Sequence, residues 1–148
     1  MTKIKINKGF TLLEIMIVSA IIIILAAASY PLYKNFYRLS GVDATRNEVV
    51  ANLRITREWA TSSKNNSPAG MYFSGSDYVI FSGDDYLSRN QNYDLEFSVD
   101  DKLVFSGDLE IVFDKITGYV DATETLIVTN TITGDQLNIE VLTSGVIQ

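Results

Sequence analysis

The fold of this chain is decided by one apolar stretch near its N-terminus, FTLLEIMIVSAIIIILAAASYPLY (residues 10–33). Its 24 residues contain a single charge, Glu14. A helix needs about 20 apolar residues to cross the core of a bilayer, and Phe10 to Tyr30 supplies 21. The stretch therefore predicts a transmembrane helix that includes Phe10, Thr11, Leu12, Leu13, Ile15, Ile21, Ile22, Ile23, Ile24 and Leu25.

Three lysines, Lys3, Lys5 and Lys8, precede the apolar stretch with no acidic residue among them. Lys and Arg flanks remain on the cytoplasmic side of a membrane. We therefore expect a single-pass membrane protein, with its N-terminus in the cytoplasm and the rest of the chain outside. The alternative, a buried helix of an intracellular protein, does not explain why the lysines directly precede the stretch.

The composition narrows the chemistry. The 148 residues include 12 basic and 18 acidic side chains, but residues 10–148 alone have 9 and 18, a net charge of -9. A chain this acidic is a poor general binder of nucleic acid. With no Cys and no His, thiolate and imidazole catalysis are excluded, and so are metal sites built on those ligands. We expect no catalytic residues, no metal and no cofactor.

Two kinds of processing fit the apolar stretch. An ordinary secretory signal peptide has a short apolar region followed by small residues at the cleavage site. Residues 15–25 followed by three alanines fit that description, with cleavage before Ser29. However, Thr11 and Glu14 place polar groups at the start of the stretch. A carboxylate in lipid is costly without a partner, so Glu14 is a functional candidate.

The second kind of processing is suggested by the residues that begin the stretch, Lys8-Gly9-Phe10-Thr11-Leu12-Leu13-Glu14 followed by Ile15-Met16-Ile17-Val18. This segment resembles the N-terminal signature of the type IV pilin superfamily, which includes the pseudopilins of type II secretion systems. Pro31 also matches a proline common in such stems. The resemblance implies that a prepilin peptidase cuts between Gly9 and Phe10, that the new Phe10 amine is methylated, and that the stem becomes a filament core.

Elementary chemistry gives three of these residues a physical role. Gly9 has no side chain, so a protease can close around the backbone there. Glu14 lies one helical turn after Phe10 and can pair with the Phe10 amine of its own or a neighbouring subunit; the alternative is a tolerated charge near the membrane interface. Pro31 predicts a kink or an ordinary helix end, because proline lacks the N–H of a helical bond.

A second helical pattern follows the apolar stretch, from Tyr33 to Ser63. Val42, Val49, Val50, Leu53 and Ala60 recur near helical spacing and predict a buried face, bordered by Trp59. Residues 10–63 then form one bent helix of roughly 80 Å. The helix is expected to end in the polar segment of residues 62–68, which closes with Pro68.

Beyond Pro68 the apolar period changes to two, which predicts strands of an antiparallel sheet over residues 93–99, 109–113, 126–132 and 137–141. Thr133-Gly134-Asp135 predicts a hairpin turn. The fold class is therefore α+β, a long N-terminal helix packed on an antiparallel β-sheet domain. The domains are a cleaved leader (1–9), a transmembrane and filament-core helix (10–38) and a pilin-like domain outside the cytoplasm (39–148).

Two further patterns bear on binding. Asp84, Asp85, Asp100 and Asp101 invite a calcium site or a carboxylate pair for glycoside hydrolysis, but solvated loops explain them better. The C-terminal half, through Phe113, Gly118 and the closing residues 142–147, is similar to the H-type minor pseudopilins and their pilus-side relatives. Some of those relatives bind DNA through basic tail residues, which this chain lacks.

The sequence thus predicts a structural subunit, a minor pilin or pseudopilin, rather than an enzyme. The resemblance implies as partners a prepilin peptidase, other subunits that bundle through the N-terminal helix, and an inner-membrane assembly platform. No nucleotide-binding motif is present, so the driving ATPase is expected to be a separate protein. The alternatives are a tethered or secreted binding domain with an ordinary signal peptide, or a DNA-uptake minor pilin.

Overall fold

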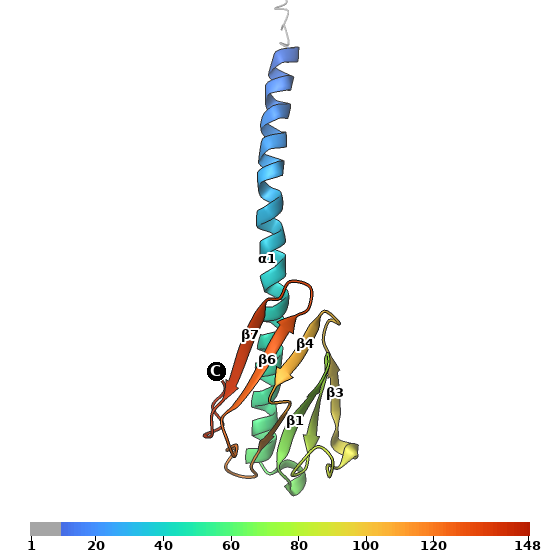
Figure 1. Ribbon diagram of the computed structural model, residues 1–148, viewed down its shortest axis with the longest axis vertical. Coiled ribbons are helices and arrows are strands. Elements are labelled where there is room, and N and C mark those ends of the chain that lie inside the picture. The colour runs from blue at the N-terminus through green and yellow to red at the C-terminus, as the bar shows by residue number, and fades with distance from the viewer. Residues whose placement is uncertain (1–9) are drawn as a thin grey trace, which may run out of the picture. The chain divides into compact units, whose positions relative to one another are not determined.

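The computed structural model describes residues 10–148, and the side chains of residues 10–27 and 41–148. It contains one long helix, α1 (Leu12–Thr61), followed by β-strands (Figure 1). The chain divides into two compact units, Met1–Tyr37 and Arg38–Gln148. We call the second the globular unit, and its helix is the C-terminal half of α1.

The end of α1 lies in the polar segment expected to stop it. Ser63, Asn65 and Asn66 have positive φ angles of 52°, 60° and 58°, a conformation that short polar side chains tolerate but that breaks a right-handed helix. A short 3₁₀-helix, η1 (Lys64–Asn66), crosses this turn. The helix is two residues shorter at each end than the predicted range of 10–63.

The strands form two antiparallel sheets, whereas the sequence predicted one. The first sheet has the order β3-β2-β1-β5 and the second β4-β6-β7. The strand bounds are β1 (Ala69–Ser74), β2 (Asp77–Ser82), β3 (Leu95–Ser98), β4 (Leu103–Gly107), β5 (Glu110–Phe113), β6 (Glu124–Asn130) and β7 (Gln136–Val141).

The division into two sheets has a local cause at the end of β4. Gly107 has a φ of 92°, which favours glycine, and the next amide, that of Asp108, donates to the carbonyl of Thr125. The chain therefore leaves the β4-β6-β7 sheet sharply, and β5 pairs with β1 instead. A turn of this kind has no apolar period, so the alternation of side chains did not reveal it.

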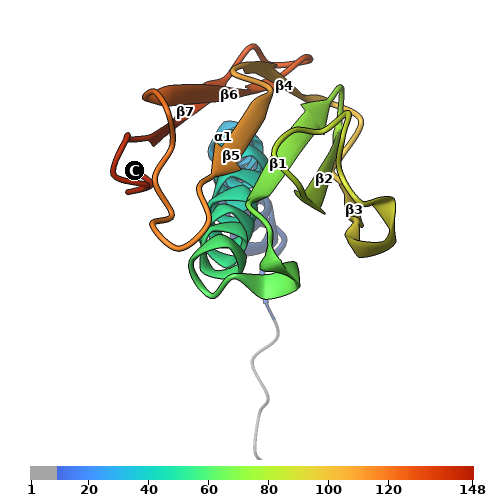
Figure 2. The ribbon, with the colours of Figure 1, turned by 90° about the horizontal axis from the view of Figure 1, so that it is seen from below.

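The core lies between α1 and both sheets, which curve round the helix in Figure 2. All five helix positions predicted to face the sheet are buried, and Trp59 packs at their border as expected. The strands contribute alternate residues, which include Met71, Phe73, Ile80, Ile111, Phe113, Leu126, Val128 and Ile139. The α+β fold with an antiparallel β domain is confirmed.

The strand predicted from residue 93 to 99 is shorter and less buried than expected. Tyr93 belongs to a 3₁₀-helix, η2 (Gln91–Tyr93), and only Leu95–Ser98 forms β3. Leu95 remains 43% exposed because β3 is the edge strand of its sheet. The hairpin at residues 133–135 is confirmed, with Gly134 at a φ of 74° between β6 and β7.

Candidate functional site

The first candidate site is the beginning of α1, which we call the stem segment (Phe10–Ala27). Thr11 caps the helix, because its Oγ1 accepts a hydrogen bond from the amide of Glu14 at 3.2 Å. Its carbonyl accepts from the amide of Ile15, also at 3.2 Å. The sequence analysis placed Thr11 within the span and missed this cap. The pattern of Thr followed three residues later by Glu is the signature that indicates it.

Glu14 therefore lies in the first helical turn, where the helix dipole favours a negative charge. Among the described residues its carboxylate has no hydrogen bond or ion pair. By contrast, the hydroxyl of Ser19 is already bonded within the helix, because it donates to the carbonyl of Ile15 at 2.7 Å. Of these two polar side chains, Glu14 is the one without a partner among the described residues.

The apolar side chains of the stem segment are exposed, from 48% at Val18 to 79% at Phe10 and Leu12. Exposed apolar patches of this extent mark surfaces that another molecule covers. The exposed set comprises Phe10, Leu12, Leu13, Ile15, Met16, Ile17, Val18, Ile21, Ile22, Ile23, Ile24 and Leu25.

Within the part of the chain that the structure describes, no helix is long and apolar enough to cross a membrane. The membrane span predicted over Phe10 to Tyr30 is thus not confirmed. Gly9 and the three lysines before it lie outside the described residues, so the predicted cleavage remains a prediction. The alternative of a helix end at Pro31 is wrong, because α1 continues to Thr61. The side chain of Pro31 is not among the described ones, and the kink remains a prediction.

The structure separates the acidic residues that suggested a calcium site or a catalytic carboxylate pair. Asp84 and Asp85 follow β2, and Asp100 and Asp101 follow β3. Because these strands are antiparallel, with Asp77 opposite Ser98, the two acidic pairs lie at opposite ends of them. No cluster of three metal-ligating side chains is present among the described residues.

Two of these four acidic residues accept hydrogen bonds from nearby residues in their own loops. Hydrogen bonds from the hydroxyl and amide of Ser88 lower the pKa of Asp85 below its ordinary value. Asp100 accepts from the amide of Lys102 at 3.0 Å. These are the bonds of tight polar loops, which is the interpretation favoured from the sequence.

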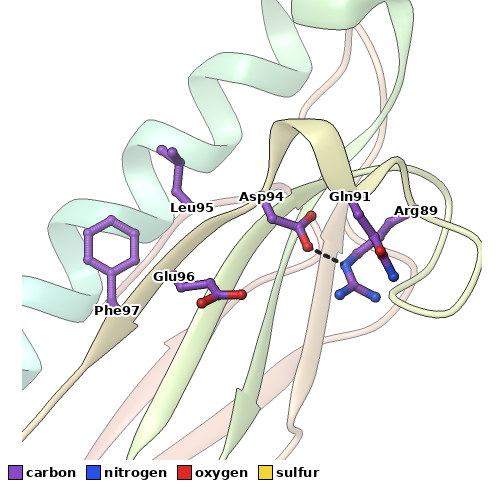
Figure 3. Close-up of a pocket in the computed structure, with 6 residues that line it drawn as sticks. All are labelled: Arg89, Gln91, Asp94, Leu95, Glu96 and Phe97. Atoms are coloured by element: carbon purple, nitrogen blue, oxygen red, sulfur yellow. Dashed lines mark hydrogen bonds and ion pairs between the residues drawn. The ribbon is translucent and has the colours of Figure 1, made fainter.

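A hollow of about 720 Å³ lies beside the segment between β2 and β3 (Figure 3). In it Arg89 Nε lies 2.8 Å from Asp94 Oδ2, and both side chains are almost buried, with 13% and 11% exposed. Asp94 Oδ1 has no hydrogen-bond partner among the described residues. The guanidinium also donates to the carbonyl of Tyr86 at 2.6 Å. The arrangement holds residues 86–94 together as a rigid loop.

Two other sets of polar contacts join the helix to a strand and to two loops of the globular unit. The hydroxyl of Tyr78 donates to Glu48 Oε1 and accepts from Asn52 Nδ2, both at 2.7 Å. Burial, followed by the hydrogen bond to Glu48, raises the pKa of Tyr78 well above its ordinary value. Arg57 donates to the carbonyls of Gly118 and Ser144. The helical spacing of apolar residues does not reveal these bonds, because both acceptors lie far from Arg57 in the sequence.

Comparison with known proteins identifies one match. Residues 4–30 match the family model of the prokaryotic N-terminal methylation motif. No curated protein and no solved structure matches the chain. The motif supports the prepilin-type signature seen in the sequence, but it ends at residue 30. The resemblance of the C-terminal half to H-type minor pseudopilins is therefore not confirmed.

The matched motif points to a pilin-like or pseudopilin-like subunit that is processed at its N-terminus. Such a motif implies processing by a prepilin peptidase and assembly with other subunits, and it suggests a structural protein rather than an enzyme. Its matched residues include the whole stem segment, whose apolar side chains the structure leaves uncovered.

Proposed function

We propose that this chain is a structural subunit, a major or minor pilin or pseudopilin, of a type IV pilus or a type II secretion pseudopilus. A prepilin peptidase cuts it between Gly9 and Phe10, and the new Phe10 amine is methylated. The observation that carries the proposal is the methylation motif over residues 4–30, combined with the exposed apolar stem segment that the motif includes.

Assembly by helix bundling follows from the exposure of the stem segment. Burying one Leu or Ile side chain completely contributes about 1.5–3 kcal/mol, and the segment has nine exposed Ile and Leu residues. The globular unit already has a closed core between α1 and the sheets. The stem segments of neighbouring subunits are the natural cover for one another.

Glu14 has a separate role in this proposal. Its carboxylate pairs with the methylated Phe10 amine of a neighbouring subunit, because an isolated charge inside a helix bundle is strongly unfavourable. Removing one partner of a buried pair costs about 3–5 kcal/mol. A contribution of that size biases the choice of subunit at each addition step.

Before assembly we expect the stem segment to hold the chain at the cytoplasmic membrane. The lysines at positions 3, 5 and 8 stay in the cytoplasm with the cleavage site, and the globular unit lies outside. An assembly platform in that membrane and a separate ATPase extract the subunit into the filament.

N-terminal sequencing and mass spectrometry of the mature chain test the processing. We expect a methylated N-terminus at Phe10, and an uncut precursor for Gly9→Leu, because a bulky side chain then occupies the cleavage site. A mature chain that begins at Ser29 would show an ordinary signal peptide and a free secreted domain, and would overturn the proposal.

The pairing role of Glu14 is tested by cell fractionation and immunoblots of sheared filaments. Glu14→Ala should still be cut, should accumulate in the membrane fraction and should be missing from filaments. Ser19→Ala is the matched control, since Ser19 is a polar residue of the same helix whose hydroxyl is already hydrogen-bonded to a helix carbonyl. Normal amounts of the Glu14 variant in filaments would refute the pairing.

A further inference from the structure

A second hollow lies on the face of the β3-β2-β1-β5 sheet that points away from α1. Its volume is about 450 Å³, and its lining includes Tyr72, Asp77, Val79, Tyr86, Glu96 and Ser98. We call it the Tyr72 groove. The alternation of side chains places it there, because the strand neighbours Met71, Phe73, Tyr78 and Ile80 are buried in the core.

The strand register brings two carboxylates together in this groove. Tyr72 lies opposite Val79, and Val79 lies opposite Glu96, so the three form one row across the sheet. Asp77 belongs to the adjacent row and is therefore a diagonal neighbour of Glu96 on the same face. Among the described residues neither carboxylate has a hydrogen bond or an ion pair, so both charges are available to a cation.

Contacts within the chain hold the aromatic wall of the groove in place. The ring of Tyr86 stacks on Tyr72 with centroids 3.9 Å apart, and the guanidinium carbon of Arg89 lies 3.7 Å from the centroid of the Tyr86 ring. The amide of Tyr86 donates to Glu110 at 2.6 Å, while Arg89 is itself paired with Asp94. Arg89 therefore stabilises the wall and leaves the two carboxylates unneutralised.

Among the side chains that the structure describes, Arg54 is a cation that matches the groove. Of the seven Lys and Arg side chains within residues 41–148, six contact a partner: Arg46, Arg57, Lys64, Arg89, Lys102 and Lys115. Arg54 is exposed and has none. A planar guanidinium suits both carboxylates and aromatic rings, and the neighbouring Ile55, 43% exposed, adds apolar surface.

Arg54 cannot enter the groove of its own chain. It is exposed on α1, whereas the groove lies on the face of the sheet that points away from α1. Figure 2 shows that this sheet packs against the helix. A contact between two different surfaces of identical copies is heterologous, and such contacts give open helical assemblies wherever the rotation between copies does not close into a ring. That is the symmetry of a filament.

We propose that the Tyr72 groove binds the Arg54 side chain of a second copy of this chain. The guanidinium lies between Asp77 and Glu96, against the wall formed by Tyr72 and Tyr86. The proposal rests on the proposed function, because a filament brings copies side by side. It adds a contact between globular units to the bundling of the stem segments.

Cross-linking in sheared filaments of the full-length chain tests the contact, and the absence of native Cys makes introduced thiols unique. The variant carries Glu58→Cys, one helical turn after Arg54, and Ser98→Cys, in the lining of the groove, so that Arg54, Asp77 and Glu96 are all kept. It is treated with a short bis-maleimide, since the two Cα atoms are expected to lie beyond the reach of a disulfide. We expect a ladder of dimers, trimers and longer products. Either single variant alone should give none, and the two co-expressed should give dimers only.

Charge reversal provides the second test, which does not depend on cross-linking. Arg54→Glu should lower the amount of the chain in filaments about tenfold or more, as expected for one partner of a desolvated charge pair. Combining it with Glu96→Arg should restore incorporation. Asp101→Asn, an exposed acid outside the groove, is the matched control and should change nothing.

The outcomes separate this contact from the proposed function. If the wild-type chain is present in filaments but the double-Cys variant gives no ladder and Arg54→Glu assembles normally, the groove contact is wrong and the function stands. Dimers from Glu58→Cys alone would indicate a twofold contact and would also overturn it. A wild-type chain that is absent from filaments would overturn both.

Discussion

Arg57 joins the C-terminal half of α1 to the two loops that close the globular unit. Its Nε donates to the carbonyl of Gly118 at 3.2 Å, and its Nη2 donates to the carbonyl of Ser144 at 3.1 Å. Both loops depend on one side chain of the helix. Arg57→Ala should therefore leave two carbonyls without their donor and destabilise the globular unit.

The size of the effect follows from the two bonds. A hydrogen bond to a charged group contributes about 1.5–3 kcal/mol. Because Arg57 is only half-buried, the lower end of that range applies, and losing both bonds should lower the free energy of unfolding by about 3 kcal/mol. With a urea m-value of about 2 kcal/mol/M, the midpoint of unfolding should fall by about 1.5 M.

The assay is urea unfolding of residues 39–148, followed by circular dichroism. This fragment contains the buried core, and we expect it to fold alone. Arg54→Ala is the matched control, because Arg54 is the same residue type on the same helix, exposed and without a partner. It should change the stability by less than about 0.5 kcal/mol. Equal midpoints for the two variants would refute the reasoning.

Three further predictions concern the same fragment. Tyr78→Phe should lose about 1–2 kcal/mol of stability through the bond to Glu48. Because folding raises the pKa of Tyr78, the stability contributed by its hydroxyl is present below the unfolded pKa of about 10 and falls at higher pH. The same loss of stability at alkaline pH in wild type and variant would contradict this. Gly145→Ala should destabilise by at least 1–2 kcal/mol in thermal unfolding, since a Cβ there meets the Gly118 carbonyl at a φ of 73°; an unchanged Tm would count against it. Burial, with the neighbouring charge of Asp108 second, raises the pKa of Glu124, so the folded state disfavours its ionised form. Glu124→Gln should be more stable than the wild type at pH 7, with the difference shrinking as the pH falls through the raised pKa of Glu124 and gone below the unfolded value of about 4.3; a difference independent of pH would argue otherwise.

Much of the fold was predictable because its patterns are local. Helical spacing alone identified the buried positions from Val42 to Ala60, since residues three and four apart share one face of a helix. The Gly134 turn and the helix end before Pro68 follow from the backbone preferences of single residues. The N-terminal motif is also local, and it carries most of what can be said about function.

What the tertiary structure decided depends on pairings between distant segments. The spacing of alternating residues does not determine which strands pair. It therefore could not predict that the strands form two sheets or that β3 is an edge strand. The Tyr72 groove joins residues from β1, β2, β3 and the loop that follows β2, and Arg57 reaches carbonyls 61 and 87 residues away. Such contacts exist only once long-range register is set, because each depends on backbone positions that no single stretch of sequence determines.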